Sequence, residues 1–185
     1  MNIPTREECL LLLHELQMPP HIQRHSMMVA KIALHLGNLL NTNSLRVNLS
    51  LLEAGALLHD VGKPQSIFTG ERHEELGASI LAERGYRWLA PIVMEHVSLD
   101  RKRVDGPINE SILVNYSDKR VRHDQVVTLE DRFDDLMDRY AKTEDHRSRM
   151  KKKFVLFREL EQKIFEHLSI CPSGKEIMTL TLEDL

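Results

Sequence analysis

Cysteine is scarce in this chain of 185 residues, and so are glycine and proline. The two cysteines, Cys9 and Cys171, lie near opposite ends, which excludes the dense disulfide framework of small secreted domains and favours a reducing compartment. Eight glycines and seven prolines are too few for low-complexity sequence, and 42% apolar residues are too many for a disordered chain. Because the length fits one domain of ordinary size, we expect a single domain over residues 1–185.

Long hydrophobic runs are missing as well. The leucines from Leu10 to Leu13 fall far short of the roughly 18 to 20 apolar residues that span a bilayer. The first ten residues also lack the basic-then-apolar order of a signal peptide. We therefore expect no membrane partner and a cytoplasmic location.

Neither sign of charge dominates the composition. The 25 basic and 28 acidic residues give a formal net charge of −3, which supplies no overall field that would attract polyanions. A basic run at 147–153 is followed by Glu159, Glu161 and Glu166 on the same expected helix. We interpret this run as a solvated face, so nucleic acid is not an expected partner.

Alternating β-branched residues, which would indicate strands, do not persist anywhere, whereas apolar residues recur at helical spacing along nearly the whole chain. Thr5 and Glu8 form a capping-box pattern at the start of the first helix. Further helices are expected from Pro20 to Gly37 or the polar stretch 41–44, and over about 49–60, 73–84, 88–96, 109–121, from 128 onward and 146–168, with loops at 64–72 and 98–107. The predicted fold class is all-α.

Histidine, in contrast, is abundant, with ten residues. His25, His59, His73 and His96 fall on four different expected helices or helix ends, and Asp60 follows His59 where the hydrophobic helix LLEAGALLHD stops. Unpaired polar side chains at the edge of a core are costly, and a bound cation would satisfy them. The residues alone leave open that the His-Asp pair merely caps the turn before Pro64.

The order His25, His59-Asp60 and Asp118 resembles the HD-domain superfamily of metal-dependent phosphohydrolases, whose motif is H…HD…D. HDVGK at 59–63 is similar to the HDIG variant of that motif. The resemblance covers about residues 20–142 and implies a single-domain helical bundle of the HD-domain type, followed by a C-terminal helical extension at about 143–185.

The resemblance also implies a ligand set. His25, His59, Asp60 and Asp118 match the residues that bind one metal in this superfamily. His73 and His96 match the additional histidines of members that hold two metals, in which the HD aspartate bridges both. Imidazole and carboxylate donors without thiolate suit one or two divalent ions of Fe, Mn, Zn, Co or Ni.

By the same resemblance, the expected activity is hydrolysis of a phosphate ester of a nucleotide or similar small molecule, by attack of a metal-bound hydroxide. Asp60, Lys63 and Arg122 are the candidate catalytic residues. Lys63 would offer a cation to a phosphate oxygen, and Arg122 would share a helix face with Asp118 and reach the substrate or pair with a ligand carboxylate. His123 is interpreted as a solvated residue near a helix end.

Other readings stay open at this point. Glu74 and Glu75 could act as a general acid or base, although carboxylates at a helix start more often complement the helix dipole. The same fold would also suit a dinuclear-iron oxygenase, or a regulatory module that binds a metal or nucleotide without catalysis. The sequence contains no P-loop and no H-E-x-x-H zinc-peptidase pattern.

Overall fold

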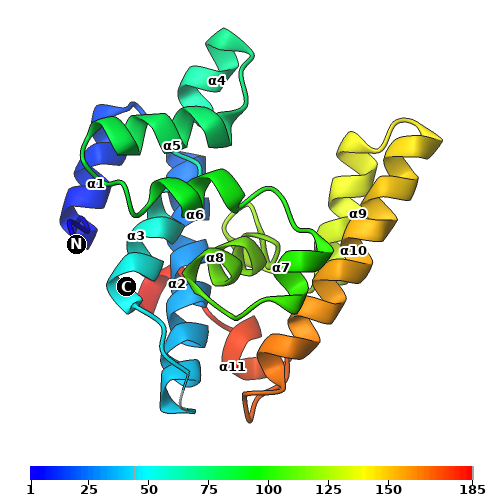
Figure 1. The fold of residues 1–185 in the computed structure, drawn as a ribbon. Coiled ribbons are helices and arrows are strands. Elements are labelled where there is room, and N and C mark those ends of the chain that lie inside the picture. Colours follow the sequence, from blue (N-terminus) through cyan, green and yellow to red (C-terminus); the bar gives the residue numbers. More distant parts are fainter. Residues whose placement is uncertain (44, 185) are drawn as a thin grey trace.

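The structure is a computed structural model that describes residues 1–43 and 45–184, and it consists almost entirely of helices (Figure 1). In chain order they are α1 (Arg6–Glu15), α2 (Pro20–Thr42), α3 (Leu49–Leu58), α4 (Lys63–Thr69), α5 (His73–Glu83), α6 (Ala90–Glu95), α7 (Arg101–Asp105), α8 (Glu110–Asp118), α9 (Leu129–Tyr140), α10 (Glu144–Phe165), α11 (Lys175–Met178) and the 3₁₀ turn η1 (Leu182–Asp184). The predicted all-α fold class is confirmed. None of these helices, within the described residues, is both long and apolar enough to span a membrane.

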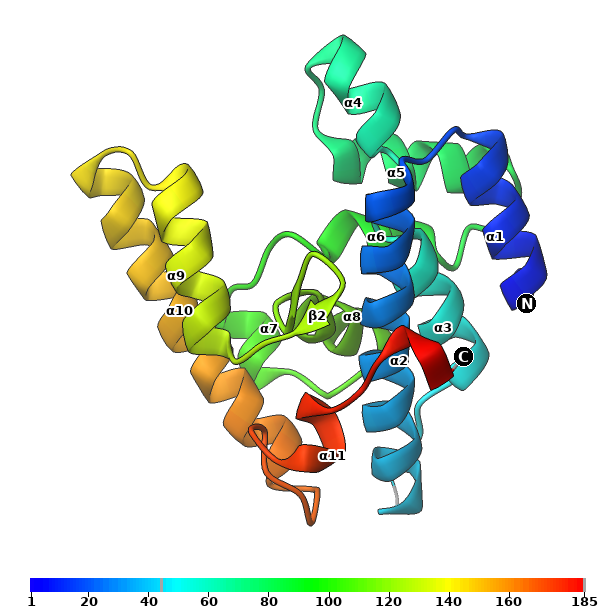
Figure 2. The same ribbon diagram turned by 180° about the vertical axis from the view of Figure 1, so that it is seen from behind.

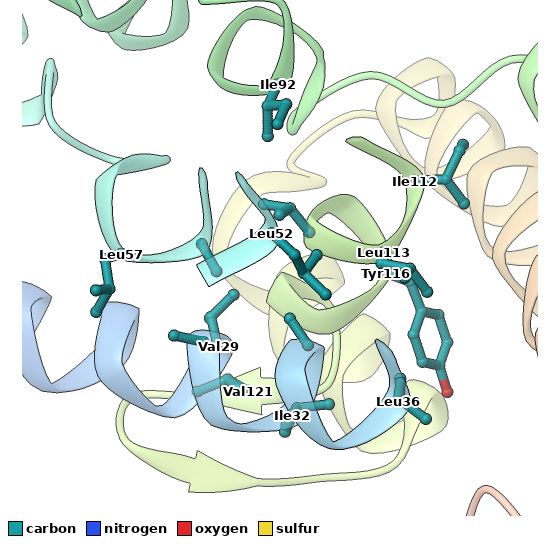
Figure 3. Packing of buried hydrophobic residues seen from close by; sticks show 14 of the residues in the cluster. Val29, Ile32, Leu36, Leu52, Leu57, Ile92, Ile112, Leu113, Tyr116 and Val121 are labelled. Atoms are coloured by element: carbon teal, nitrogen blue, oxygen red, sulfur yellow. The ribbon is translucent and has the colours of Figure 1, made fainter. Parts of the chain in front are cut away.

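Helix α2 is the centre of the core. Pro20 opens it, which suits a first helical position because proline lacks the N–H that would stay unpaired there. Val29, Ile32 and Leu36 recur at helical spacing and are fully buried against α3 and α8 (Figure 3). The helix continues through Gly37 and ends at Thr42, and Ser44 of the expected polar stop lies outside the described residues.

A layer of two short helices covers one end of this core. Helices α5 and α6 pack on each other, and α6 also contacts α3 and α8 (Figure 1). The capping box at Thr5 and Glu8 is present at the start of α1, as the sequence predicts. Together α2, α3, α5, α6 and α8 supply every helix end that carries a predicted metal ligand.

Three expectations about connecting segments were wrong. The expected loop at 64–72 contains most of α4, and the one at 98–107 contains α7. Both helices are short, and α4 buries no residue. Neither sequence therefore shows apolar residues repeating at helical spacing. The helix expected over 109–121 ends at Asp118, where the next residues form i→i+3 turns and the chain enters a small hairpin.

That hairpin pairs β1 (Val121–Arg122) with the antiparallel β2 (Gln125–Val126). Its strands are too short to show the alternation of apolar and polar residues that marks a strand in the sequence. Val121 is fully buried beside α2, which anchors the hairpin on the core (Figure 3). His123 at its turn has a φ of 59°, in the left-handed region that non-glycine residues seldom adopt. The turn therefore directs the His123 carbonyl away from the ladder.

The C-terminal residues form a second layer. Helices α9 and α10 lie side by side as a pair, and α11 follows α10 and returns toward α2 (Figure 2). Phe133 of α9 contacts the rings of Phe154 and Phe157 of α10. The structure thus places α9 against α10, with the hairpin between α9 and α2 (Figure 2).

The two thiols differ in environment, and this yields a prediction. Cys9 is fully buried and burial raises its pKa to about 12, whereas Cys171 is exposed. Because the thiolate is the reactive form, one thiol per folded chain should react with a water-soluble aromatic disulfide reagent, and two after denaturation. Absorbance of the released aromatic thiol gives the number of reactive thiols in the folded and in the denatured protein. A Cys171→Ser control should leave the folded protein unreactive, and rapid reaction of that variant would contradict the burial of Cys9.

Candidate metal centre

Six side chains from five helices converge on one point. His25 lies on α2, His59 caps the end of α3 with Asp60 directly after it, His73 begins α5, His96 caps α6, and Asp118 ends α8. The ends of α3, α5, α6 and α8 meet beside the second turn of α2, which carries His25, and this places the polar residues together. The structure therefore brings together all six ligands that the resemblance implies.

Asp60 lies between two groups of possible ligands. One group is His25, His59 and Asp60, the other is Asp60, His73 and His96, and the donor atoms of each group lie within 4.8 Å of one another. Oδ2 of Asp60 is 3.3 Å from Nε2 of His59, while Oδ1 is 3.5 Å from Nε2 of both His73 and His96. Each carboxylate oxygen thus faces a different group, which is the arrangement of a bridging ligand.

Asp118 completes the first group. Its Oδ1 lies 2.9 Å from Nε2 of His25 and 3.8 Å from Nε2 of His59. In the second group, Nε2 of His73 and Nε2 of His96 are 3.1 Å apart.

Backbone carbonyls fix the tautomer of three of the rings. Nδ1 of His25 lies 2.9 Å from the carbonyl of His123, Nδ1 of His59 lies 2.8 Å from that of Ala56, and Nδ1 of His96 lies 2.6 Å from that of Val93. A carbonyl can only accept, so each Nδ1 carries the hydrogen and each neutral ring presents a bare Nε2 lone pair. This is how metal-binding histidines are oriented by their outer partners.

The donor set fits a divalent cation. Nε2 of His59 is buried without a hydrogen-bond partner, although Oδ2 of Asp60 lies 3.3 Å away. Nε2 of His73 faces Nε2 of His96, and Nε2 of His25 faces Oδ1 of Asp118, so atoms that can each bind a metal point at one another. A shared cation satisfies all of these contacts at once.

Neighbouring groups favour the ionised form of the Asp60 and Asp118 carboxylates. Burial acts to raise the pKa of Asp60, but His59, His96 and Lys63 outweigh it and hold that pKa well below its usual range. Burial likewise opposes ionisation of Asp118, and Lys119, His25 and His59 hold its pKa well below the ordinary value. Burial also lowers the pKa of His73 to about 4, so this ring is a neutral donor at physiological pH. Ionised carboxylates and neutral imidazoles are the forms that bind metals.

The family of the chain follows from a comparison of this core with known families. The family model described as HD domain matches residues 22–143, which include all six converging side chains. The chain belongs to the HD-domain family. HD domains bind divalent metals, in agreement with the donor set found here. No curated protein and no solved structure is similar enough to this HD-domain chain to be matched.

The other candidates from the sequence are placed differently. Lys63 lines the cavity into which the candidate ligands open, and it donates to Oδ2 of Asp60 at 2.6 Å. Arg122 does not line it, because α8 ends at Asp118 and the helix face expected to join the two residues does not exist. Glu74 and Glu75 are both paired with Arg72.

Several residues of the cavity were missed in the sequence. The ligands open into a cavity of about 630 Å³ whose walls also contain His123, Arg132, Arg139 and Tyr140. His123 was interpreted as solvated, yet its ring lines the cavity and its carbonyl orients His25. Arg132 and Arg139 are seven residues apart on the strongly amphipathic α9, a period that would have marked them as sharing one face. Which way that face points is known only from the structure.

The glycine of the HDVG string has a structural role that leads to a prediction. A Cβ on Gly62 would lie 2.1 Å from the carbonyl oxygen of His73 and 2.6 Å from the amide of Gly77, so α5 packs directly on this turn. Gly62→Ala should therefore displace His73 and weaken metal binding by about tenfold or more, the range for losing the support of a ligand. Metal titration of chelator-treated protein measures this.

The matched control is Gly70→Ala at the other end of α4. Gly70 has a φ of 73° with nothing within 4 Å of the added carbon, so only backbone strain of about 1 kcal/mol is expected. That variant should unfold more easily yet bind metal normally. Equal metal affinities in the two variants would contradict the role given to Gly62.

Proposed function

We propose that this HD-domain protein is a metal-dependent phosphohydrolase that cleaves a phosphate ester of a nucleotide or a similar small molecule. One observation carries the proposal: two groups of imidazole and carboxylate donors share Asp60 at the base of a cavity that also contains Lys63. Paired metal sites with a shared carboxylate are typical of enzymes that transfer phosphoryl groups to water.

The protein side chains have distinct tasks in this proposal. Divalent ions held by the six ligands would supply Lewis acidity and a water of lowered pKa. Asp60 would hold both ions at a fixed separation, since its two oxygens face different histidines. Lys63 is partly exposed to the cavity and carries its charge beside Asp60, where it would donate to a phosphate oxygen and offset charge that develops there.

The remaining walls suit an organic substituent. Ile22, Val97, Leu136 and Tyr140 contribute apolar surface to the cavity beside the ligands. A volume of about 630 Å³ lies within the range of sites that bury a small organic ligand. These walls support a nucleotide or similar ester as the substrate.

The test combines metal analysis with a panel of substrates. Protein purified without chelator should contain one or two of Fe, Mn, Zn, Co or Ni per chain, and reloading with at least one of them should release phosphate or a nucleotide from phosphomonoesters, dinucleotides or cyclic nucleotides. A panel that stays uncleaved with every metal would overturn the proposal. Oxygen consumption with a mixed-valent iron signal would show an oxygenase instead, and tight nucleotide binding without product would show a regulatory module.

A further inference from the structure

We infer that Arg132 and Arg139 form a second anion site in the cavity, so that the substrate carries a second phosphoryl or other dianionic group beside the one bound at the metal ligands. The inference rests on the proposed function, since it names the substrate class for the same cavity. It favours nucleoside diphosphates, triphosphates or bisphosphates over monophosphates. The argument begins with the position of these arginines.

Both arginines line the cavity from α9, a helix that carries none of the candidate metal ligands. Helix α9 carries them seven residues apart, and both side chains line the cavity together with Asp60 and Asp118. Figure 2 shows the hairpin that carries His123 between α9 and α2. Cationic groups therefore line the cavity from α9 as well as from Lys63 of α4.

Arg132 and Arg139 share one carboxylate partner. Arg132 pairs with Asp135 at 3.0 Å, and Arg139 pairs with the other oxygen of the same carboxylate at 2.9 Å. Within the residues that the structure describes, neither arginine forms an ion pair with a further carboxylate. Two guanidinium groups on one carboxylate leave one positive charge for an anion.

Hydrogen-bonding capacity is left over as well. Nε of Arg132 is buried and has no hydrogen-bond partner, and the side chain is only 15% exposed. A buried guanidinium N–H without a partner is costly, and a phosphate oxygen is the acceptor that this planar fork suits best. Arg139 is 44% exposed and has donors free to turn toward a ligand.

His123 joins this site to the metal ligands. Its carbonyl accepts from Nδ1 of His25, and its ring nitrogen Nε2 lies 3.4 Å from a terminal nitrogen of Arg139. A single residue thus contacts a metal ligand on one side and an α9 arginine on the other. This spacing suits adjacent or closely linked phosphoryl groups, because the two sites belong to one cavity.

The ordinary alternative is that these arginines only stabilise α9 through i, i+3 and i, i+4 ion pairs. Arg149 provides a matched comparison, since it pairs with Asp145 at 2.5 Å with i, i+4 spacing on α10 and does not line the cavity. Arg149→Gln removes such a pair without touching the proposed site.

The experiment uses two probes that cannot be hydrolysed, methylphosphonate and methylenediphosphonate, titrated calorimetrically into the metal-loaded full chain with metal in excess. The wild-type protein should bind the diphosphonate at least about tenfold more tightly than the monophosphonate. Arg139→Gln should lose about tenfold for the diphosphonate only, the factor expected for one charge-assisted hydrogen bond. Arg149→Gln should match the wild type.

Two further variants keep the test decisive. Arg132→Gln should act as Arg139→Gln does, with its melting temperature recorded because Arg132 is largely buried. Asp135→Asn frees both guanidinium groups and should bind the diphosphonate more tightly than the wild type, whereas a purely structural role predicts lower stability and no gain in affinity. Equal loss for both probes, or no difference between Arg139→Gln and Arg149→Gln, would overturn the inference.

The outcomes separate this inference from the proposed function. If nothing in the substrate panel is cleaved but the diphosphonate preference disappears in Arg139→Gln, the anion site stands and hydrolysis fails. If monophosphates are cleaved as well as diphosphates, and Arg139→Gln binds both phosphonate probes as tightly as the wild type does, hydrolysis stands and the anion site fails.

Discussion

Asp60→Ala is expected to remove metal and hydrolytic activity together. Its two carboxylate oxygens face different histidine groups, so the substitution takes one ligand from each. Replacing an outer partner of a ligand costs about 10- to 100-fold in metal affinity, and loss of a shared ligand should exceed that. Activity should fall by more than about a thousandfold, because metal ions supply several kcal/mol of transition-state stabilisation. Metal content by mass spectrometry and initial rates on the best substrate measure both.

Lys63→Ala is the matched comparison for Asp60→Ala. The two side chains contact each other at 2.6 Å, but only Asp60 belongs to the donor groups. Lys63→Ala should keep its metal and lower kcat/KM by about 10- to 100-fold, the loss expected when one charged hydrogen bond to substrate is removed. Full metal occupancy in Asp60→Ala would refute the assignment of the site, and metal loss in Lys63→Ala would show that Lys63 supports the ligands.

The six converging side chains could be predicted from the sequence because they follow a recognisable pattern. His59 and Asp60 end a hydrophobic helix, and the order of His25, the HD pair and Asp118 resembles a known motif. The sequence also predicted most helices, since α2 buries apolar residues at helical spacing and α3 and α8 are buried nearly all round. Where a helix packs in the core, sequence and structure agree.

The cavity wall formed by α9 could not be predicted from the sequence, for a physical reason. Arg132 and Arg139 lie on a helix whose partner surface is set by how α9 packs on α10, through Phe133, Phe154 and Phe157. No local sequence pattern predicts how α9 packs on α10. Arg122 was misplaced because a helix was extended past Asp118, where the chain turns to bury Val121. The backbone conformation of His123 was equally hidden, since non-glycine residues seldom adopt a positive φ.

Arg120, which follows α8, connects the helical core to the C-terminal segment around Pro172. It is 1% exposed and donates to the carbonyls of Val127 and Pro172, at 2.8 and 2.7 Å, and to the hydroxyl of Tyr116 at 2.6 Å. Its guanidinium also lies 3.4 Å from Glu161 of α10, which is itself buried and accepts from Tyr116. One side chain thus holds α8, the hairpin, α10 and the segment before α11 together.

Arg120→Ala should therefore destabilise the protein more than any surface change. It removes the buried cation beside the Glu161 carboxylate and leaves only the half-exposed Arg158 at 3.1 Å, and breaking a buried pair in this way costs about 3–5 kcal/mol. For a chain of this size the melting temperature should fall by roughly 10 °C. Urea unfolding at neutral pH, followed by far-UV circular dichroism, gives the free energy directly.

Arg158 and a double variant complete this test. Arg158 pairs with the same Glu161 at 3.1 Å but is 51% exposed, so Arg158→Ala should cost less than about 1 kcal/mol. Arg120→Met combined with Glu161→Leu should be more stable than Arg120→Ala, because removal of both charges also removes the uncompensated one. If the double variant is no more stable than Arg120→Ala, the loss of stability comes from the hydrogen bonds to Val127 and Pro172. These carbonyl contacts, and not the ion pair, would then hold the C-terminal segment on the core.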